Sequence, residues 1–234
     1  ARYMRQQHVD VLCFQEFGGN KHFTADSLRR ALSHWQYALI PADDSIRGLL
    51  PIAVFSRYSL TGGRFITYPH SSNCSMLCDI VAGTDTIRLL NNHLQTTGVS
   101  RNRKKWEREL TTDNTRREAQ AVQDAAETLH ENFVKRAAQT DSICHLAITA
   151  PHPVLVCGDF NSLPSSYTYR RLSEFLEDGF KTGGHGYMYT YRYDKRMLRI
   201  DYAFHSPELE CIDYYSPDLD LCSDHNPVIF TVKY

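Results

Sequence analysis

Short apolar runs separated by turn residues recur towards both ends of the chain, and each run has the length of a β-strand. In the first part of the chain, strands are predicted at residues 9–15, 35–40, 51–56, 64–67, 75–82 and 86–93. Gly62-Gly63 and Gly83-Thr84-Asp85 are turn signals between the later runs. Further strands are predicted at residues 154–157, 199–204 and 226–232, and the alternating tyrosines of residues 187–193 indicate a half-exposed strand.

Helical spacing of apolar residues occurs between these strand clusters. Residues 2–8 are predicted to end a helix, and Thr24 can cap another that extends over residues 24–33. A further helix is predicted to begin at Ser165 or Ser166. Strand clusters interrupted by helices in both halves indicate two packed sheets with helices outside, in a single domain over residues 1–234.

The longest predicted helix begins where Thr115 and Glu118 fit a capping box. Apolar residues follow at helical spacing, at Ala119, Val122, Ala126, Leu129 and Phe133. Such a stripe is typical of an amphipathic helix, so we expect this face to pack on a sheet.

Short polar segments stand directly beside the predicted strands. Burying such groups costs free energy unless they are hydrogen-bonded or serve a function. Carboxylates, asparagines and histidines together suit a hard divalent cation and a phosphate ester. We therefore predict one shared site, built from Gln15-Glu16, Asn91-Asn92-His93, Gly158-Asp159-Phe160-Asn161, Arg199-Ile200-Asp201-Tyr202 and Ser223-Asp224-His225.

Composition narrows the class of protein without fixing its substrate. Hydrophobic residues make up 42% of the 234 residues, which is enough for a sizeable core. The net charge of -1 predicts no strong bulk attraction to nucleic acid, although a local basic patch would suffice. No apolar stretch is long enough to span a membrane, and no signal peptide is visible. The 7 cysteines favour free thiols and slightly favour the cytoplasm, unless an upstream segment carries an anchor or a signal.

In their order along the chain, these segments resemble the motifs of the endonuclease/exonuclease/phosphatase superfamily of metal-dependent phosphodiesterases. The matching motifs are Leu12-Cys13-Phe14-Gln15-Glu16, Asn91-Asn92-His93-Leu94, Gly158-Asp159-Phe160-Asn161-Ser162, Arg199-Ile200-Asp201-Tyr202 and Ser223-Asp224-His225. Residues 157–166 look most like the deadenylase-type branch. The resemblance implies an α+β, DNase I-like fold: a four-layer αββα sandwich of two mainly antiparallel sheets flanked by helices. It also implies phosphoester hydrolysis with Mg²⁺ or Mn²⁺ at one rim of the sheets.

The resemblance implies catalytic roles for several of these residues. Asp159 resembles the residue that positions or deprotonates the attacking water, and Asn161 resembles the amide that holds that water or the phosphate. His225 resembles the histidine that faces the scissile phosphate, oriented by Asp201. His93 resembles a second histidine, either a proton donor to the leaving oxygen or a phosphate ligand.

The same resemblance implies metal ligands and substrate contacts. Glu16 is similar to the family's principal metal ligand, and Asp224 to the second acid near the metal. Asn91 is a candidate substrate contact through its amide, or else simply ends its strand. Tyr191 is the other candidate substrate contact, because the family tends to have an aromatic residue in the loop before the Arg-Ile-Asp-Tyr strand.

The chemistry of the residues agrees with these roles. A phosphodiester is anionic and repels an attacking water, and a bound cation neutralises that charge and stabilises the transition state. Mg²⁺ usually keeps several waters, so one or two carboxylates suffice and a remaining acid is available to act on water. An Asp–His pair fixes the imidazole tautomer and favours the imidazolium.

The sequence departs from the family pattern at its start. The family usually has a strand before the first Glu, ending in an Asn that supports the metal. This sequence begins only a few residues before the first predicted strand. We therefore expect the domain to lack that strand and an inner strand edge to be open.

Structural explanations stand beside these functional ones. Asp159 and Asn161 also suit an Asx turn that caps the next helix. His225 with Asp201 also suits a buried pair that serves stability alone. The basic run at residues 101–108 also contains an acid and is typical of a solvated face.

Three functions remain open from the sequence. The first is hydrolysis of nucleic acid phosphodiesters, and the second is hydrolysis of inositol phosphates or lipid head-group phosphoesters. Salt dependence would separate these two, because binding to a phosphate backbone weakens steeply with salt. The third is a non-catalytic binding module. Substitutions at the acid or histidine positions would mark such a module, and the motifs contain no such substitution. No protein partner is implied, and we expect a monomer that binds a phosphoester.

Overall fold

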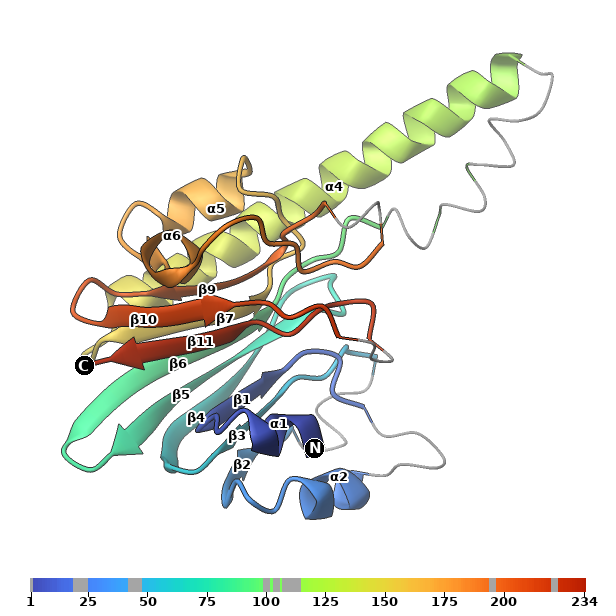
Figure 1. Ribbon diagram of the computed structural model, residues 1–234. Coiled ribbons are helices and arrows are strands. Elements are labelled where there is room, and N and C mark those ends of the chain that lie inside the picture. The colour runs from blue at the N-terminus through green and yellow to red at the C-terminus, as the bar shows by residue number, and fades with distance from the viewer. Residues whose placement is uncertain are drawn as a thin grey trace.

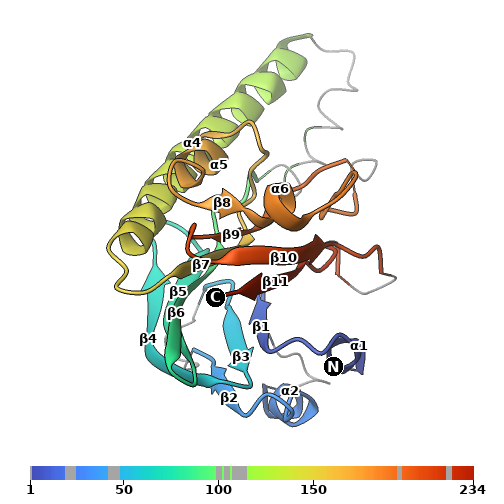
Figure 2. The same cartoon turned by 60° about the vertical axis from the view of Figure 1, so that its left-hand side comes forward.

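The computed structural model of the protein describes residues 2–18, 25–41, 48–98, 102, 106, 115–193, 197–219 and 223–234. Its strands form two packed layers with helices on both outer sides, as Figure 1 and Figure 2 show. The predicted Thr24 cap lies outside the described residues, and so does most of the basic run at residues 101–108. Among the described helices, none combines the length and the apolar character that crossing a membrane requires.

The larger layer is a 6-stranded sheet in the order β4-β5-β6-β7-β9-β8. Its strands are β4 (Ser59–Thr67), β5 (Cys74–Ala82), β6 (Asp85–His93), β7 (Val154–Asp159), β8 (Glu177–Asp178) and β9 (Asp201–His205). β6 and β7 run parallel, and the other neighbouring strands run antiparallel. A parallel pair requires a long crossover connection. Helix α4 (Thr115–Ile148) supplies most of its described length and lies along the outer face of this sheet (Figure 2).

The second layer is in two pieces, a 3-stranded sheet in the order β1-β3-β2 and a 2-stranded sheet of β10 and β11. Its strands are β1 (Val11–Phe14), β2 (Tyr37–Leu39), β3 (Ala53–Ser56), β10 (Glu210–Tyr215) and β11 (Ile229–Lys233). Within the described ranges, β1 pairs only with β3 and β11 only with β10. Leu155 and Cys157, on the face of β7 that is turned towards this layer, are only half-buried. The face of β7 turned to α4 is fully covered.

Helices complete the two outer layers. α4 and α5 (Tyr167–Leu172) cover the larger sheet, and α6 (Gly179–Gly183) lies beside β9 and β10. α1 (Arg2–Gln6) and α2 (Ala25–Ala31) lie beyond β1-β3-β2, on the opposite side of the molecule (Figure 2). The predicted α+β class and αββα sandwich are confirmed.

Apolar side chains fill the space between successive layers. The cluster between α4, α5 and the larger sheet includes Leu90, Ile143, Val156, Leu172 and Phe204. The cluster between the two sheets includes Ile52, Val54, Met76, Ile80 and Leu89. The cluster on the side of α1 and α2 includes Leu12, Leu32, Trp35, Ala53 and Phe55. Alternation along the strands sends side chains to both faces of a sheet, so β1 and β3 contribute both to the cluster between the sheets and to the cluster on the side of α1 and α2.

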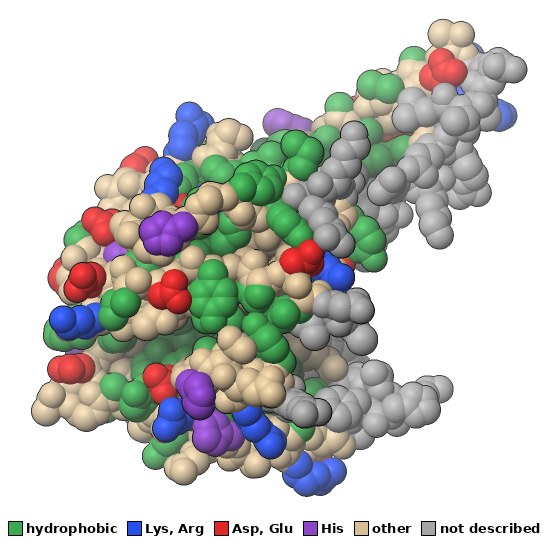
Figure 3. Space-filling view, viewed as in Figure 1, with side chains coloured by type: hydrophobic (Ala, Val, Ile, Leu, Met, Phe, Trp, Pro, Cys, Tyr) green, Lys and Arg blue, Asp and Glu red, His purple; other side chains and the backbone are tan. Residues whose placement is uncertain are grey.

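The predicted apolar stripe of the long helix does not pack on a sheet, and that prediction was wrong. Val122 is 59% exposed and Phe133 is 51% exposed. With 34 residues α4 is about 50 Å long, whereas a strand of 9 residues spans about 30 Å. Its first half therefore projects beyond the sheet, and Figure 3 shows apolar side chains on its surface. The buried face begins further along the helix and contains Arg136, Gln139, Thr140, Ile143, Cys144 and Ala147.

Some of the predicted local structure also differs. Gly62 and Gly63 lie inside β4, where the register shifts between Thr61 and Arg64, so the glycines mark a bulge rather than a turn. Residues 187–193 form no strand in their described positions, and Tyr191 makes only isolated bridges. β8, β10 and α6 were not predicted, because they are short or have mostly exposed side chains.

Candidate active site

Strand register brings three of the predicted site residues side by side. His93 ends β6, Asp159 ends β7, and Asp201 begins β9. In the sheet, His93 lies opposite Asp159 and Asp159 lies opposite Asp201. Because β9 runs antiparallel to β7, its start lies at the same edge as the ends of β6 and β7. The larger sheet thus gathers these side chains at a single edge.

His225 joins this group from the loop before β11. Its Nδ1 lies 2.8 Å from an Asp201 carboxylate oxygen, and ligand atoms of Asp159, Asp201 and His225 all lie within 4.8 Å of one another. The hydroxyl of Thr190 accepts hydrogen bonds from the backbone N–H groups of Ile200, at 3.0 Å, and Asp201, at 3.1 Å. These bonds hold the start of β9 and orient the carboxylate that faces His225.

Charge around the imidazole favours its protonated form. Burial of His225 disfavours the imidazolium, but the hydrogen bond and charge of Asp201, together with the charge of Asp159, outweigh it. The net effect raises the pKa of His225 to about 9. At neutral pH this side chain is therefore a cation that can donate to a phosphate oxygen.

Asp159 is held in a defined orientation by the residues that follow it. The Asn161 backbone N–H donates to Asp159 Oδ1 at 2.8 Å, and Asn161 Nδ2 donates to Asp159 Oδ2 at 3.1 Å. Asn161 Nδ2 also donates to the Leu94 carbonyl at 3.0 Å, with the Asn161 backbone at φ 47°. An Asx turn is thus present, but helix α5 is capped by Ser166 instead. Burial and the charge of Asp201 raise the pKa of Asp159.

His93 lies between two of the predicted acids. Its Nε2 is 3.5 Å from Asp159 Oδ2 and 3.9 Å from Glu16 Oε1. Burial lowers the pKa of His93 to about 4, so the ring is neutral at physiological pH. The Glu16 side chain is 63% exposed, and its backbone lies in the left-handed region at φ 51°. This φ turns the chain directly after β1 and carries the carboxylate to the edge of the larger sheet.

Asn91 connects the two sheets. Its Nδ2 donates to the carbonyls of Phe14 and Ala53, each at 3.2 Å, and its Oδ1 accepts from Gln15 Nε2 at 2.6 Å. The side chain is fully buried. These contacts are those of a residue that supports the site from behind, and substrate contact by Asn91 stays a prediction.

Tyr191 and Asp224 lie beside His225 at the outer rim. The Tyr191 ring centroid is 5.2 Å from that of His225, and the two residues form an isolated bridge. Asp224 is exposed, and its backbone carbonyl accepts from the Arg192 N–H at 2.8 Å. The predicted roles, a substrate contact for Tyr191 and a metal ligand for Asp224, stay predictions.

Arg136 was not predicted from the sequence, whereas Asn92 and Gly158 lie inside the predicted motifs without an assigned role. Asn92 Nδ2 donates to the carbonyls of Leu90 at 2.9 Å and Cys157 at 3.0 Å. Arg136 lies on the buried face of α4, next to the loops that follow β6 and β7. A charged residue in helical register with Ile143 and Ala147 was the signal in the sequence that could have revealed it.

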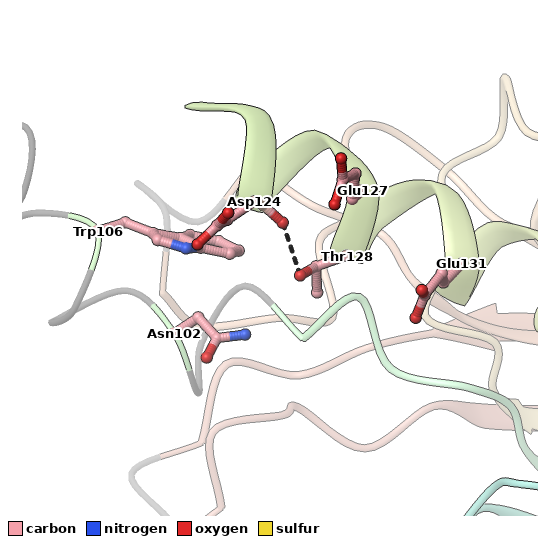
Figure 4. Close-up of a pocket in the computed structure, with 6 residues that line it drawn as sticks. All are labelled: Asn102, Trp106, Asp124, Glu127, Thr128 and Glu131. Atoms are coloured by element: carbon pink, nitrogen blue, oxygen red, sulfur yellow. Dashed lines mark hydrogen bonds between the residues drawn. The ribbon is translucent and has the colours of Figure 1, made fainter. Parts of the chain in front are cut away.

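A separate pocket of about 220 Å³ lies along the projecting part of α4. Figure 4 shows its lining residues, which are Asn102, Trp106, Asp124, Glu127, Thr128 and Glu131. None of the predicted site residues lines it, so this pocket is distinct from the cluster at the sheet edge.

A comparison with protein-family models identifies the chain. The model described as "Endonuclease/Exonuclease/phosphatase family" matches residues 1–225. The chain belongs to the endonuclease/exonuclease/phosphatase family. The predicted family is thereby confirmed, and the five motifs all begin within the matched range. A search of curated protein sequences found no match.

Solved structures of the endonuclease/exonuclease/phosphatase family share the fold. The protein from Bacteroides vulgatus has 17% identity and a TM-score of 0.68, with 99% of this chain and 87% of that chain covered. A humanized D. rerio TDP2 has 15% identity and a TM-score of 0.66, covering 100% of this chain and 89% of that one. D. rerio TDP2 complexed with single strand DNA product has 14% identity, a TM-score of 0.65 and coverage of 100% and 89%.

The residues at the sheet edge fit the divalent cation that this family generally uses. Glu16, Asp159 and Asp201 offer carboxylate oxygens, the ligand type that Mg²⁺ and Mn²⁺ prefer. Within the described ranges, His93 Nδ1 and Asn92 Oδ1 are buried without a hydrogen-bond partner. An oxygen-rich donor set with unsatisfied polar atoms behind it is a chemically suitable cation site.

Asp201→Asn is expected to lower the pKa of His225 from about 9 towards the ordinary value of about 6.5 in the metal-free protein. The folded-state pKa is raised, so the Asp201 pair stabilises the fold fully below about pH 6.5 and loses this effect as pH rises through about 9. NMR titration of the His225 ring measures the shift. The exposed Asp213→Asn on β10 is the control, and an equal shift in both variants would contradict the pairing.

Proposed function

We propose that the protein is a divalent-metal-dependent phosphodiesterase of the nuclease type. The observation that carries the proposal is the convergence of Asp159, Asp201 and His225 within 4.8 Å at the edge of the larger sheet. A carboxylate and an imidazolium facing one small volume can act on an attacking water and on an anionic phosphate, respectively. A bound cation would neutralise phosphate charge at the same place.

Asp159 is the proposed acceptor of the proton from the attacking water. Asn161 donates a hydrogen bond to each of its two oxygens. These bonds prevent rotation of the carboxylate and therefore fix the direction of its remaining lone pairs. Positioning of this kind lowers the entropy cost of reaching the reactive geometry. A bound cation favours the ionised carboxylate that this role requires, because opposite charge lowers a raised carboxyl pKa.

His225 and His93 have different proposed roles because their protonation differs. The raised pKa of His225 keeps it an imidazolium, which is suited to stabilise negative charge on the phosphate. The lowered pKa of His93 keeps it neutral, so it suits a hydrogen-bond donor to a phosphate oxygen better than a proton donor at neutral pH.

The proposed substrate is a nucleic acid phosphodiester. D. rerio TDP2, which shares the fold, has been solved with single strand DNA product. Tyr191, beside His225, offers an aromatic face on which a base can stack. The net charge of -1 predicts that binding depends on local contacts at the site rather than on a basic surface.

Hydrolysis of bis(p-nitrophenyl) phosphate tests the reaction class. We expect turnover with Mg²⁺ or Mn²⁺ and loss of turnover with EDTA, with Glu16→Gln reducing the apparent affinity for the metal. Single-stranded DNA, RNA, an inositol phosphate and a phospholipid head group should then be compared over a range of salt concentrations. Hydrolysis that weakens steeply with salt on oligonucleotides supports a nuclease, whereas faster hydrolysis of the head groups contradicts it.

Two results would contradict the proposed metal-dependent hydrolysis. Turnover that persists in EDTA would contradict metal dependence, provided that prolonged dialysis leaves it unchanged. Tight binding of an oligonucleotide without hydrolysis under any metal condition would instead support the non-catalytic binding module.

A further inference from the structure

Arg136 is a buried cation that is hydrogen-bonded to no carboxylate among the described residues. The residue is 3% exposed and lies on the face of α4 that packs on the larger sheet. Its Nε donates to the Gln95 carbonyl at 2.7 Å, and its Nη1 donates to the Ser162 hydroxyl at 3.3 Å. Its Nη2 is buried without a hydrogen-bond partner in the part of the chain that the structure describes.

Packing alone does not account for an arginine at this position. A buried charge loses the solvation of water, and apolar residues of similar volume are often neutral or stabilising replacements for buried ionic groups. Burial indeed lowers the pKa of Arg136 to about 10, which still leaves it charged at neutral pH. The buried residues next to Arg136 on α4 are the polar Gln139 and Thr140, and apolar residues occupy this face only further along, at Ile143, Cys144 and Ala147. Arg136 thus belongs to a buried polar cluster rather than to the apolar core.

The two acceptors of Arg136 belong to the two loops that carry the site. Gln95 follows His93 by two positions, and Ser162 directly follows Asn161. The guanidinium therefore joins the loop after β6 to the loop after β7. Because both bonds come from one rigid planar group, they fix the distance between the two loops.

Other bonds make these loops a single unit with α4. The Gln95 N–H donates to Gln139 Oε1 at 2.7 Å, and Gln95 Nε2 donates to Asn132 Oδ1 at 3.0 Å. The Leu94 N–H donates to the Asp159 carbonyl at 2.9 Å. Because Leu94 also accepts from Asn161, a displacement of residues 94–97 would move the side chains that orient Asp159.

We propose that Arg136 is a positioning residue of the active site, holding residues 94–97 and 160–163 at the separation at which Asn161 orients Asp159. This inference rests on the proposed function, but its first consequence is structural and is measurable without turnover. Arg136 acts on Asp159 through the two loops, and its positive charge also favours the ionised Asp159 carboxylate.

Arg136→Met tests the proposal because methionine keeps volume and helix propensity but makes neither bond. Hydrogen exchange followed by mass spectrometry is expected to show faster exchange in peptides covering residues 94–97 and 160–163. On a chromogenic phosphodiester, kcat is expected to fall about 10- to 100-fold with little change in KM, since misplacement by about 1 Å can cost about 100-fold. Arg136→Lys should remain impaired, because an ammonium cannot bridge both loops as a planar fork.

Ile143→Ala is the matched control. Ile143 is fully buried on the same face of α4, about two helical turns after Arg136, and its side chain forms no hydrogen bond with either loop. Its expected effect is lower thermal stability without faster exchange confined to the two loops and without a drop in kcat below its melting range. Ser162→Ala removes one acceptor while keeping the arginine, and a smaller loss of kcat is expected. It serves if Arg136→Met does not fold.

Two outcomes would overturn the positioning role. One is unchanged exchange in both loops of Arg136→Met and Ser162→Ala, whatever the activity. The other is a loss of kcat that Ile143→Ala reproduces at equal loss of thermal stability. If the wild type does not hydrolyse phosphodiesters, the proposed function fails, while the exchange experiment still decides whether Arg136 orders the loops.

Discussion

Asp159→Asn is expected to abolish turnover while leaving the metal-free protein at least as stable as the wild type. Asparagine cannot accept the proton of an attacking water, and losing a positioned general base costs about 10²- to 10⁴-fold. Its Oδ1 can still accept from the Asn161 N–H, so the turn after β7 is retained, although the bond from Asn161 Nδ2 to the second oxygen is lost. A chromogenic phosphodiester assay with Mg²⁺ or Mn²⁺ measures the loss.

The direction of the stability change follows from the raised pKa of Asp159. When the folded-state pKa lies above the unfolded value of about 3.9, the ionised group destabilises the fold as pH rises from about 3.9 through the folded-state pKa. Replacing that carboxyl by an amide removes the penalty at neutral pH. Thermal melting in EDTA is therefore expected to give Asp159→Asn an equal or higher Tm.

Asp213→Asn provides the control for this experiment, because it makes the same chemical change at an exposed position on β10. Its activity should match that of the wild type. Turnover by Asp159→Asn within threefold of the wild type would remove the carboxylate from the mechanism. A fall in Tm of several degrees would mean that the carboxylate contributes to folding.

Gly158→Ala is expected to destabilise the fold by about 3 kcal/mol or more, through backbone strain and overpacking together. Gly158 has a φ of 128°, which side chains rarely allow, and a Cβ there would lie 1.9 Å from the Asn92 carbonyl oxygen. That carbonyl belongs to the neighbouring strand β6, so relief requires the two central strands to separate. Urea unfolding measures the change.

Gly83→Ala is the matched control. Gly83 also has a positive φ, of 67°, but an added Cβ would meet no atom within 4 Å. Its expected cost is about 1 kcal/mol, from backbone strain alone. If the two alanine variants unfold at the same urea concentration, the close approach of β6 and β7 does not limit residue choice at Gly158.

The sequence predicted which polar side chains lie together better than it predicted the surrounding structure. Asp159 and His93 follow apolar runs within two or three residues, and the ends of strands at one edge of a sheet meet in space regardless of how the loops run. His225 and Asp201 could be paired only through the family resemblance, since they are 24 residues apart and no periodicity connects them. The structure brings them to 2.8 Å.

What the sequence did not predict depends on tertiary contacts. The stripe from Ala119 to Phe133 has ideal helical spacing, but spacing cannot indicate where the underlying sheet ends. β10 has mostly exposed side chains and no clear alternation of apolar and polar residues, so no strand was predicted there. Arg136 was missed because a charged residue in a helix is normally assigned to the solvent face.

The candidate active site is built from two separate sheets. Glu16 extends from the small β1-β3-β2 sheet, whereas Asp159, Asp201 and His225 belong to the larger sheet and the loop before β11. Asn91 carries hydrogen bonds between those parts, at Phe14 and Ala53. A cation held by Glu16 and Asp159 together would cross-link the sheets, so sliding of one sheet against the other and loss of the ion are thermodynamically coupled. Binding of such a cation would therefore favour one relative position of the two sheets over others.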